Sequence, residues 1–152
     1  RFLFGEIESV FANLFKLNDY INGEDAGYVL FNFKNGVRGF FDGNRLSDHI
    51  ARDRRLTIGE MMIEGSNGTL RLNGDGKIFK RDFGSNKEVK IHYKWQKKGF
   101  AGDSVFKCQS HILEHYLDGK NLYNSGNDYL QNLKIEEYIY KSNLMGKLLK
   151  IS

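Results

Sequence analysis

The sequence predicts an α+β domain in which an open, mostly antiparallel sheet of six or seven strands carries two C-terminal helices on one face. Short apolar stretches separated by Gly and Asn turns fill the first ninety residues, and helical periodicity replaces them in the last fifty. The chain has 152 residues, 40% of them hydrophobic, which is enough for a packed core. We expect residues 1–152 to form a single domain.

The first predicted strand, Glu6–Leu14, alternates in part. Val10, Ala12 and Leu14 fall on one side of it, and on the other lie Ile7, Ser9, Phe11 and Asn13. A hairpin follows, because Lys34-Asn35-Gly36 separates two apolar runs and Asn-Gly is a strong hairpin signal. The two runs are Tyr28–Phe33 and Val37–Phe41.

Further strands follow the same pattern of apolar runs and glycine turns. Leu56–Glu64 is rich in Ile and Met, and the turn Gly65–Gly68 leads back into Thr69–Leu72. A second turn, Gly74-Asp75-Gly76, introduces the last two predicted strands, Lys77–Arg81 and Val89–Tyr93. The result is an antiparallel meander, and its aromatic-rich open face indicates a partner surface, although a half-exposed face is the alternative.

Two helices end the chain. The first has Asp103 or Ser104 as its cap, Gly119 at its end, and an apolar stripe formed by Val105, Phe106, Gln109, Ile112, Leu113, Tyr116 and Leu117. The second opens near Ser125–Asp128 and closes at Gly146, and we expect it to bury Tyr129, Leu130, Leu133, Ile139 and Tyr140. A short strand over Leu148–Ile151 completes the prediction.

Composition argues against several classes of protein. The net charge is +4, but basic and acidic residues are interleaved, and the only basic aromatic segment is Lys94–Lys98, so we expect no nucleic-acid partner. No apolar run approaches the roughly 20 residues of a membrane span. The single cysteine, Cys108, favours a reducing, cytoplasmic location. The start at Arg1, without a leader, suggests a trimmed chain or a fragment.

Two sets of residues could carry chemistry. The stretch Asp42–His49 concentrates side chains suited to hydroxyls or carboxylates after a strand, although a solvated loop before the charged run Arg52–Arg55 is the preferred interpretation from the residues alone. His111-Ile112-Leu113-Glu114-His115 fits the H-x-x-E-H pattern of zinc peptidases, with Cys108 on the same helix side, but an ordinary polar helix face is the preferred interpretation. We therefore assign no metal site.

A nucleotide site is not predicted either. Gly74 and Gly76 supply two glycines of a dinucleotide fingerprint, but Phe79 occupies the third position and no helix follows. The segment is therefore interpreted as a hairpin turn.

Several short elements follow one another in a characteristic order along nearly the whole chain. They are the junction Arg1–Val10, the hairpin Asn35-Gly36, the segment Ile63–Leu70, Gly119, the segment Ser125–Leu130 and the ending Glu137–Gly146. This order resembles the C-terminal domain of the glucose-fructose oxidoreductase / inositol dehydrogenase family of NAD(P)-dependent oxidoreductases. A fainter likeness of Asp42–His49 points to a subgroup acting on sugars such as apiose.

This resemblance implies the substrate-binding and assembly half of an enzyme that transfers hydride between a sugar or polyol hydroxyl and NAD or NADP. The cofactor and a catalytic lysine would belong to an N-terminal dinucleotide-binding domain, and the catalytic Asp and His would precede Arg1, so no catalytic or cofactor-binding residue is assigned here. The resemblance implies substrate contacts from Asn44, Arg45, Asp48 and His49, and homo-oligomers formed through the open sheet face. Alternatives are a stand-alone ligand-binding or assembly module and a small zinc hydrolase.

Overall fold

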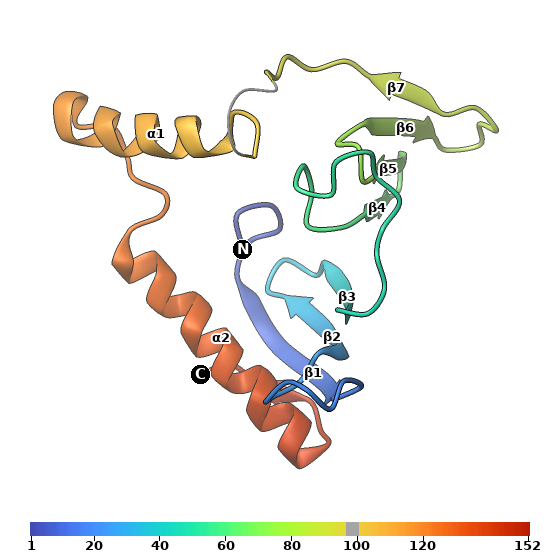
Figure 1. Cartoon of the computed structure of the whole chain (residues 1–152), viewed down its shortest axis with the longest axis vertical. Helices are drawn as coiled ribbons and strands as arrows, with labels where there is room; N and C mark the ends of the chain where they lie inside the picture. Colours follow the sequence, from blue (N-terminus) through green and yellow to red (C-terminus); the bar gives the residue numbers. More distant parts are fainter. Residues whose placement is uncertain (97–100) are drawn as a thin grey trace. The chain divides into compact units, whose positions relative to one another are not determined.

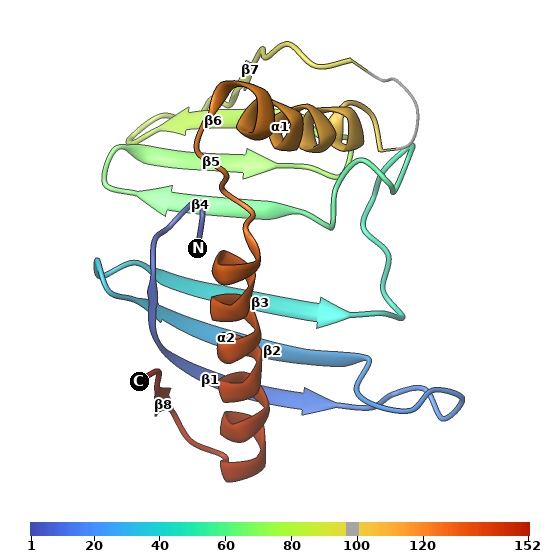
Figure 2. The same ribbon diagram turned by 90° about the vertical axis from the view of Figure 1, so that its left-hand side faces the viewer.

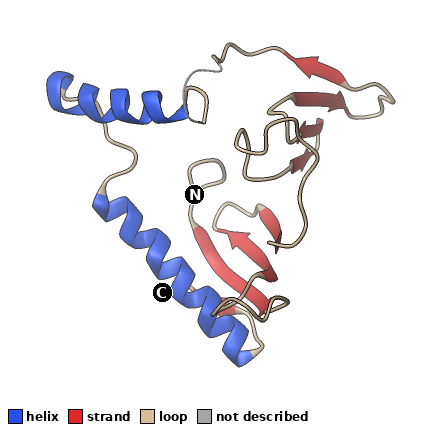
Figure 3. Cartoon of the chain, in the orientation of Figure 1, coloured by secondary structure: helices blue, strands red, loops and turns tan. Residues whose placement is uncertain are grey.

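The computed structural model describes residues 1–96 and 101–152, and these form two compact units. Unit 1 comprises residues 1–47 and 123–152, and unit 2 comprises residues 48–122. The predicted α+β class is confirmed: the described residues contain two helices and eight strands (Figures 1 and 3). The strands form two four-stranded antiparallel sheets rather than the one open sheet of six or seven strands that was predicted. The basic segment Lys94–Lys98 lies partly outside the described residues.

Unit 1 contains the first sheet, with the strand order β3-β2-β1-β8. Its strands are β1 (Ile7–Phe15), β2 (Ala26–Phe33), β3 (Arg38–Asn44) and the short β8 (Leu149–Lys150), which confirms the predicted terminal strand. The predicted hairpin joins β2 and β3. Its three-residue loop closes with a bond from the Phe33 amide to the Val37 carbonyl at 3.0 Å, and Gly36 has a φ of 90°, a conformation that favours glycine.

Strand β1 contains an irregularity that the alternation pattern did not predict. Ile7 pairs with Phe33 and Ser9 with Asn32, so the register shifts between Ile7 and Ser9. This shift turns Ile7 to the same side as Val10, where it joins the buried core. The prediction that Ile7 shares a side with Ser9 and Phe11 was therefore wrong, because a bulge changes which face a residue occupies.

Helix α2 (Gly126–Met145) crosses one face of this sheet (Figure 2). The Ser125 side chain accepts a bond from the Asp128 amide at the start, and Gly146 ends the helix in the left-handed conformation, as predicted. The packed residues are spaced by three and four: Ile135, Tyr138, Ile139 and Ser142. The expectation of burial for Tyr129, Leu130, Leu133 and Tyr140 was wrong, because these side chains lie on other faces and are 43–60% exposed.

Helix α2 also protects the edge of β1. Strand β8 pairs only with Ser9 and Val10, which leaves the following amides of β1 without a strand partner on that side. The Ala12 amide donates to the Ser142 hydroxyl at 3.0 Å, and the Leu14 amide donates to the Asn143 side chain at 2.7 Å. Two helix side chains thus replace a neighbouring strand and satisfy buried backbone donors.

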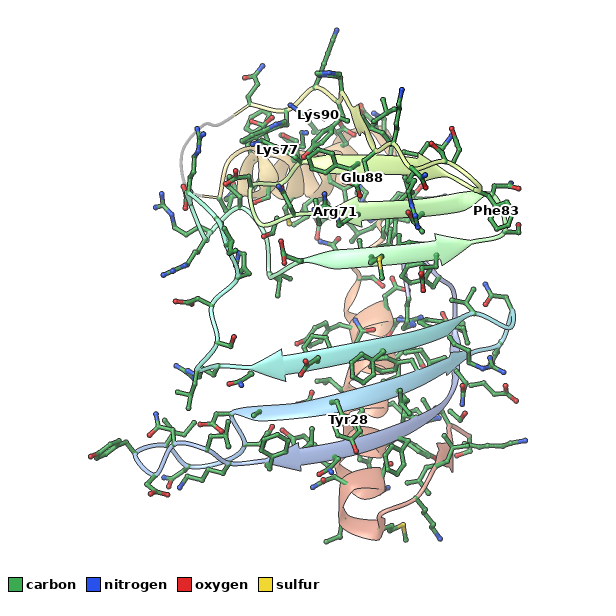
Figure 4. All side chains as sticks on the ribbon, turned by 90° about the vertical axis from the view of Figure 1, so that its right-hand side faces the viewer. Tyr28, Arg71, Lys77, Phe83, Glu88 and Lys90 are labelled. Carbon is green, nitrogen blue, oxygen red and sulfur yellow. The ribbon has the colours of Figure 1, made fainter. Side chains whose placement is uncertain are left out.

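Unit 2 contains the second sheet, in the strand order β4-β5-β6-β7. Its strands are β4 (Met61–Gly65), β5 (Gly68–Leu72), β6 (Ile78–Asp82) and β7 (Val89–Ile91). The predicted strand over Leu56–Glu64 was too long, because pairing with β5 begins only at Met61. On one side of the sheet Arg71 lies over the Phe79 ring at 4.7 Å and pairs with Glu88 at 2.7 Å (Figure 4).

Helix α1 (Ser104–Asp118) also belongs to unit 2 and ends at Gly119 in the left-handed conformation, as predicted. Asp103 occupies the N-cap position, but its side chain makes no capping hydrogen bond. No residue of α1 is buried, so the predicted apolar stripe lies open, with Phe106 and Leu117 about 70% exposed. Within the described ranges, neither helix is long and apolar enough to cross a lipid bilayer.

The face of the first sheet that does not contact α2 is also open. The Tyr28 side chain projects from this face (Figure 4), and its ring centroid lies 6.4 Å from that of Phe11 and 6.1 Å from that of Phe40. Polar groups accompany these rings, since the Asn32 amide donates to the Ser9 hydroxyl at 2.8 Å. The open face therefore carries a row of aromatic rings, and aromatic residues are enriched in protein interfaces.

Candidate substrate-binding site

A pocket of about 330 Å³ lies in unit 1 where β2 begins and β3 ends. We call it the strand-end pocket. Antiparallel pairing creates it, because Ala26 opens β2 directly opposite Asn44, which closes β3. Apolar side chains and two glycines line its walls, and its polar lining consists of Glu24, Asp25, Asn44 and Arg45.

Gly27 and Gly43 are paired across β2 and β3, and neither adds a side chain to the pocket lining. A Cβ atom at Gly27 would lie 2.7 Å from the Asn13 carbonyl oxygen and 2.9 Å from the Leu14 Cα. A Cβ atom at Gly43 would lie 2.8 Å from the Phe41 ring. Both positions therefore need glycine for close packing, which leaves the Phe41 and Leu14 side chains as the apolar lining.

Asp25 organises the pocket rather than offering a free ligand. Its side chain is buried, and its two oxygens accept bonds from the Leu17 amide at 2.6 Å and the Asn18 amide at 2.8 Å. Its backbone carbonyl accepts a bond from the Arg45 amide at 2.8 Å. Asp25 thus fixes both the loop before β2 and the chain after β3, and both of its carboxylate oxygens are occupied.

Glu24 connects the pocket to helix α2. The Tyr140 hydroxyl donates to Glu24 Oε1 at 2.5 Å, and a second pocket of about 350 Å³ shares Glu24 and Leu14 with the first. The bond from Tyr140 holds the pKa of Glu24 below its usual range, and the same bond raises the pKa of Tyr140. Glu24 is therefore an ionised hydrogen-bond acceptor at neutral pH and is poorly suited to act as a general base.

Asn44 and Arg45 supply the donors. Asn44 Oδ1 accepts a bond from the Leu46 amide at 2.9 Å, which fixes the side-chain amide and leaves its NH₂ group available. Arg45 is exposed, and within residues 1–96 and 101–152 its guanidinium makes no hydrogen bond or ion pair. The predicted residues Asn44 and Arg45 are thus brought together in one pocket, with Asn44 ending β3 rather than lying in a loop beyond Phe41.

The predicted residues Asp48 and His49 belong to unit 2. Asp48 forms an exposed ion pair with Arg54 at 3.0 Å. His49 Nε2 lies 3.3 Å from the Thr57 hydroxyl, which in turn donates to the Gly74 carbonyl. His49 therefore has a partner that holds its ring against the β5–β6 turn, so its contribution to a substrate site remains a prediction.

The strand-end pocket suits a small neutral molecule with several hydroxyl groups. Glu24 accepts hydrogen bonds, Asn44 and Arg45 donate them, and the Leu14, Val29 and Phe41 side chains provide an apolar wall. The arrangement is one that binds and orients a ligand.

Sequence reasoning did not include Glu24 and Asp25 in the site. The signal that could have identified them is the hairpin itself, because a loop centred on Asn35 pairs residues symmetrically along β2 and β3. Extending that register past Ala26 and Asn44 brings Asp25 beside Arg45.

The metal and nucleotide candidates of the sequence lie in ordinary helix and turn contacts. Within residues 1–96 and 101–152, no three His, Cys, Asp or Glu side chains are grouped to hold a metal. His115 Nδ1 lies 2.6 Å from the Lys120 carbonyl, and Glu114 pairs with the Lys120 ammonium at 3.1 Å. Gly74–Gly76 forms the turn between β5 and β6 and opens no helix, as predicted.

Comparison with known proteins indicates the class of protein to which this fold is related. No family model matches the chain. D-apiose dehydrogenase from Paraburkholderia graminis is 28% identical over 159 residues, a match that covers 99% of this chain and 41% of that protein. The chain therefore spans less than half the length of this relative.

Solved structures show the same fold. An oxidoreductase from Agrobacterium radiobacter, in complex with NAD+, L-tartaric acid and magnesium, aligns with a TM-score of 0.81 and 22% identity over 99% of this chain and 45% of its own. The WlbA dehydrogenase from Bordetella pertussis, in complex with NADH and UDP-GlcNAcA, aligns with a TM-score of 0.68 and 19% identity over 99% of this chain and 42% of its own. The predicted resemblance to the C-terminal domain of the glucose-fructose oxidoreductase / inositol dehydrogenase family is confirmed.

Proposed function

We propose that this chain is the substrate-binding and assembly half of an NAD(P)-dependent oxidoreductase that acts on a sugar or polyol. The observation that carries the proposal is the strand-end pocket, whose Asn44 and Arg45 donors are free to bind hydroxyl groups. The similarity to D-apiose dehydrogenase supports a sugar as the ligand. The chain's own residues would bind and orient the substrate, while hydride transfer would depend on the nicotinamide.

The nicotinamide cofactor would bind to a separate N-terminal dinucleotide-binding domain, because this chain covers less than half of each of the two neighbours solved with NAD+ or NADH. The open face of the first sheet, with Phe11, Tyr28 and Phe40 at its centre, is the proposed surface for homo-oligomer assembly. The protein would act in the cytoplasm, as the single cysteine suggests.

Substitution of Arg45 tests the substrate site. In the full-length enzyme, with D-apiose as the first substrate assayed, Arg45→Ala should lower kcat/KM about tenfold or more, because one charge-assisted hydrogen bond contributes about 1.5–3 kcal/mol. Arg55→Ala is the matched control, since Arg55 pairs with Asp53 at an exposed position outside the pocket. Equal kinetics for Arg45→Ala and Arg55→Ala would remove Arg45 from the site.

A stand-alone ligand-binding module is the second candidate, because the strand-end pocket lies entirely within unit 1 and its lining can bind a ligand without a cofactor. The two candidates differ in their need for nicotinamide. The binding-module interpretation is correct under two conditions. This chain alone must bind the sugar, and every extended protein that contains this chain must fail to reduce NAD+ or NADP+ in the presence of that sugar. No observation favours a zinc hydrolase, since both Glu114 and His115 already contact Lys120.

A further inference from the structure

Unit 2 contains a second pocket with a different lining, about 230 Å³ in volume, between the end of β7 and the start of α1. We call it the tryptophan pocket, after Trp95, the only tryptophan of the chain. It is lined by the aromatic rings of Tyr93 and Trp95 and by the charged side chains of Asp75, Asp103 and Lys107. None of these residues lines the strand-end pocket.

The two aromatic rings are held in place but remain accessible. The Tyr93 hydroxyl donates to the Gly76 carbonyl, which ties the tyrosine to the β5–β6 turn. The Trp95 ring lies against Gly102, where a Cβ atom would be 3.6 Å from the ring. Trp95 is 41% exposed and Tyr93 45% exposed, so both rings present apolar surface to a ligand.

Asp103 has an unusual role at this pocket. It occupies the N-cap position of α1, yet its carboxylate accepts a bond from the Gln96 amide at 2.9 Å and lies 3.7 Å from the Lys107 ammonium. The side chain that would ordinarily cap the helix thus connects the segment containing Trp95 to the pocket wall. One of its two oxygens has no hydrogen-bond donor among the residues described.

Asp75 is the second carboxylate of the pocket lining. Its carboxylate accepts a bond from the Arg52 amide at 2.8 Å and another from the Lys77 ammonium at 3.2 Å. These bonds hold the pKa of Asp75 below its usual range, the bond from Arg52 most of all. The Asp75 carboxylate is therefore ionised and held in place, with the Lys77 ammonium as its counter-charge.

The backbone of the pocket is strained at one position. Ala101 has a φ of 56° and is the one non-glycine residue with a positive φ among the residues described. A residue with a Cβ atom adopts this conformation only at an energetic cost. The Ser104 hydroxyl donates to the Ala101 carbonyl at 2.8 Å and helps to maintain it. Strain of this kind often accompanies ligand sites, because the surrounding structure must enforce it.

The combination of charges and rings restricts the chemistry of the ligand. An anion would meet two carboxylates, and a cation would meet Lys107 and the positive end of the α1 dipole. A neutral ring with hydroxyl groups satisfies the whole lining, because its C–H face can lie on the indole while hydroxyls donate to Asp103 and accept from Lys107. The volume lies below the roughly 300–1,000 Å³ typical of drug-sized ligands, which fits a molecule as small as a monosaccharide.

We propose that the tryptophan pocket binds a neutral monosaccharide, with Trp95 as the stacking surface and Asp103 and Lys107 as the polar contacts. This site is additional to the proposed substrate site. It depends neither on a nicotinamide cofactor nor on Arg45.

Because Trp95 is the only tryptophan, its fluorescence reports on this pocket directly. D-xylose, titrated into the 152-residue chain, should change that fluorescence along a saturable curve with a dissociation constant of about 1 mM. Asp103→Asn should weaken binding about tenfold, the effect expected when a hydrogen bond to a charged group is lost. Asp118→Asn provides the matched control, since it removes a carboxylate from the other end of the same helix.

The proposal stands if D-xylose binds saturably to the chain, Asp103→Asn weakens binding and Asp118→Asn does not. It is overturned if no saturable change occurs in fluorescence or calorimetry, if Asp103→Asn binds D-xylose as well as the unaltered chain, or if inorganic phosphate binds in its place. Should Asp103→Asn lose the fold by circular dichroism, Lys107→Gln serves as the second variant with the same two outcomes. Binding that survives Arg45→Ala separates this site from the proposed substrate site.

Discussion

Removal of the Ser142 hydroxyl tests how α2 holds the first sheet. Ser142 is completely buried, and its hydroxyl makes two bonds at once. It accepts from the Ala12 amide at 3.0 Å and donates to the Lys147 carbonyl at 2.7 Å. Ser142→Ala changes the side-chain volume little, so its effect on stability reports on hydrogen bonding rather than on a large cavity.

The expected cost follows from the burial of each partner. Ala12 is 2% exposed, so its amide would remain without a partner and without water, at a cost of about 1–3 kcal/mol. The bond to the Lys147 carbonyl is only part-buried, so its loss should cost about 1 kcal/mol. Ser142→Ala should therefore destabilise the chain by about 2–4 kcal/mol, a large part of the roughly 5–15 kcal/mol that stabilises a typical domain.

Urea unfolding followed by far-ultraviolet circular dichroism measures this difference, and hydrogen exchange at the Ala12 amide locates it. Glu136→Ala is the matched control, because Glu136 is an exposed position of the same helix and should change stability by less than about 0.5 kcal/mol. If Ser142→Ala and Glu136→Ala unfold alike and the Ala12 amide remains equally protected, the proposed role of α2 in covering the β1 edge is wrong.

Two further substitutions test local geometry. Gly68→Ala would place a Cβ atom 2.1 Å from the Arg81 carbonyl oxygen and should destabilise unit 2 by at least about 1–3 kcal/mol. Urea unfolding followed by Trp95 fluorescence measures this loss. Gly65→Ala is the control and should cost less, because the nearest atom to its Cβ would be 3.9 Å away. Tyr140→Phe removes the bond that lowers the pKa of Glu24, so an NMR titration should show that pKa rising toward its ordinary value. In the unaltered chain, the stabilisation from ionised Glu24 is present above the ordinary pKa of a glutamate and is lost as the pH falls through the lowered pKa. If the pKa of Glu24 is the same in Tyr140→Phe as in the unaltered chain, the bond from Tyr140 is not the cause of the lowered pKa.

Local signals explain why most elements could be predicted. The loop at Asn35-Gly36, the turn at Gly74–Gly76 and the helix ends at Gly119 and Gly146 depend on backbone conformations that few residues besides glycine adopt. Such positions indicate structure without knowledge of the rest of the fold. Element type and order were therefore accessible from the sequence.

The errors arose where tertiary contacts decide the outcome. The bulge beside Ile7 has no sequence signature, and it moves that side chain into the core. In α2 every turn carries apolar residues, so periodicity alone could not distinguish the packed face with Ile135 from the exposed face with Leu130 and Tyr129. The Ser142 hydroxyl is fully buried because it satisfies a strand amide, which a scale of hydrophobicity cannot anticipate.

The candidate site could also be predicted only in part, because tertiary pairing brings its residues together. Asn44 and Arg45 could be recognised as polar residues near the end of a strand, but Asp25, which positions them, lies twenty positions earlier and is connected to them only by antiparallel pairing. Asp25 directs both carboxylate oxygens to backbone amides, and this leaves Glu24, Asn44 and Arg45 as the groups able to meet a ligand. The pocket thus separates residues that hold the loops from residues that bind. A substitution at Asp25 should therefore impair folding, while a substitution at Arg45 should impair binding alone.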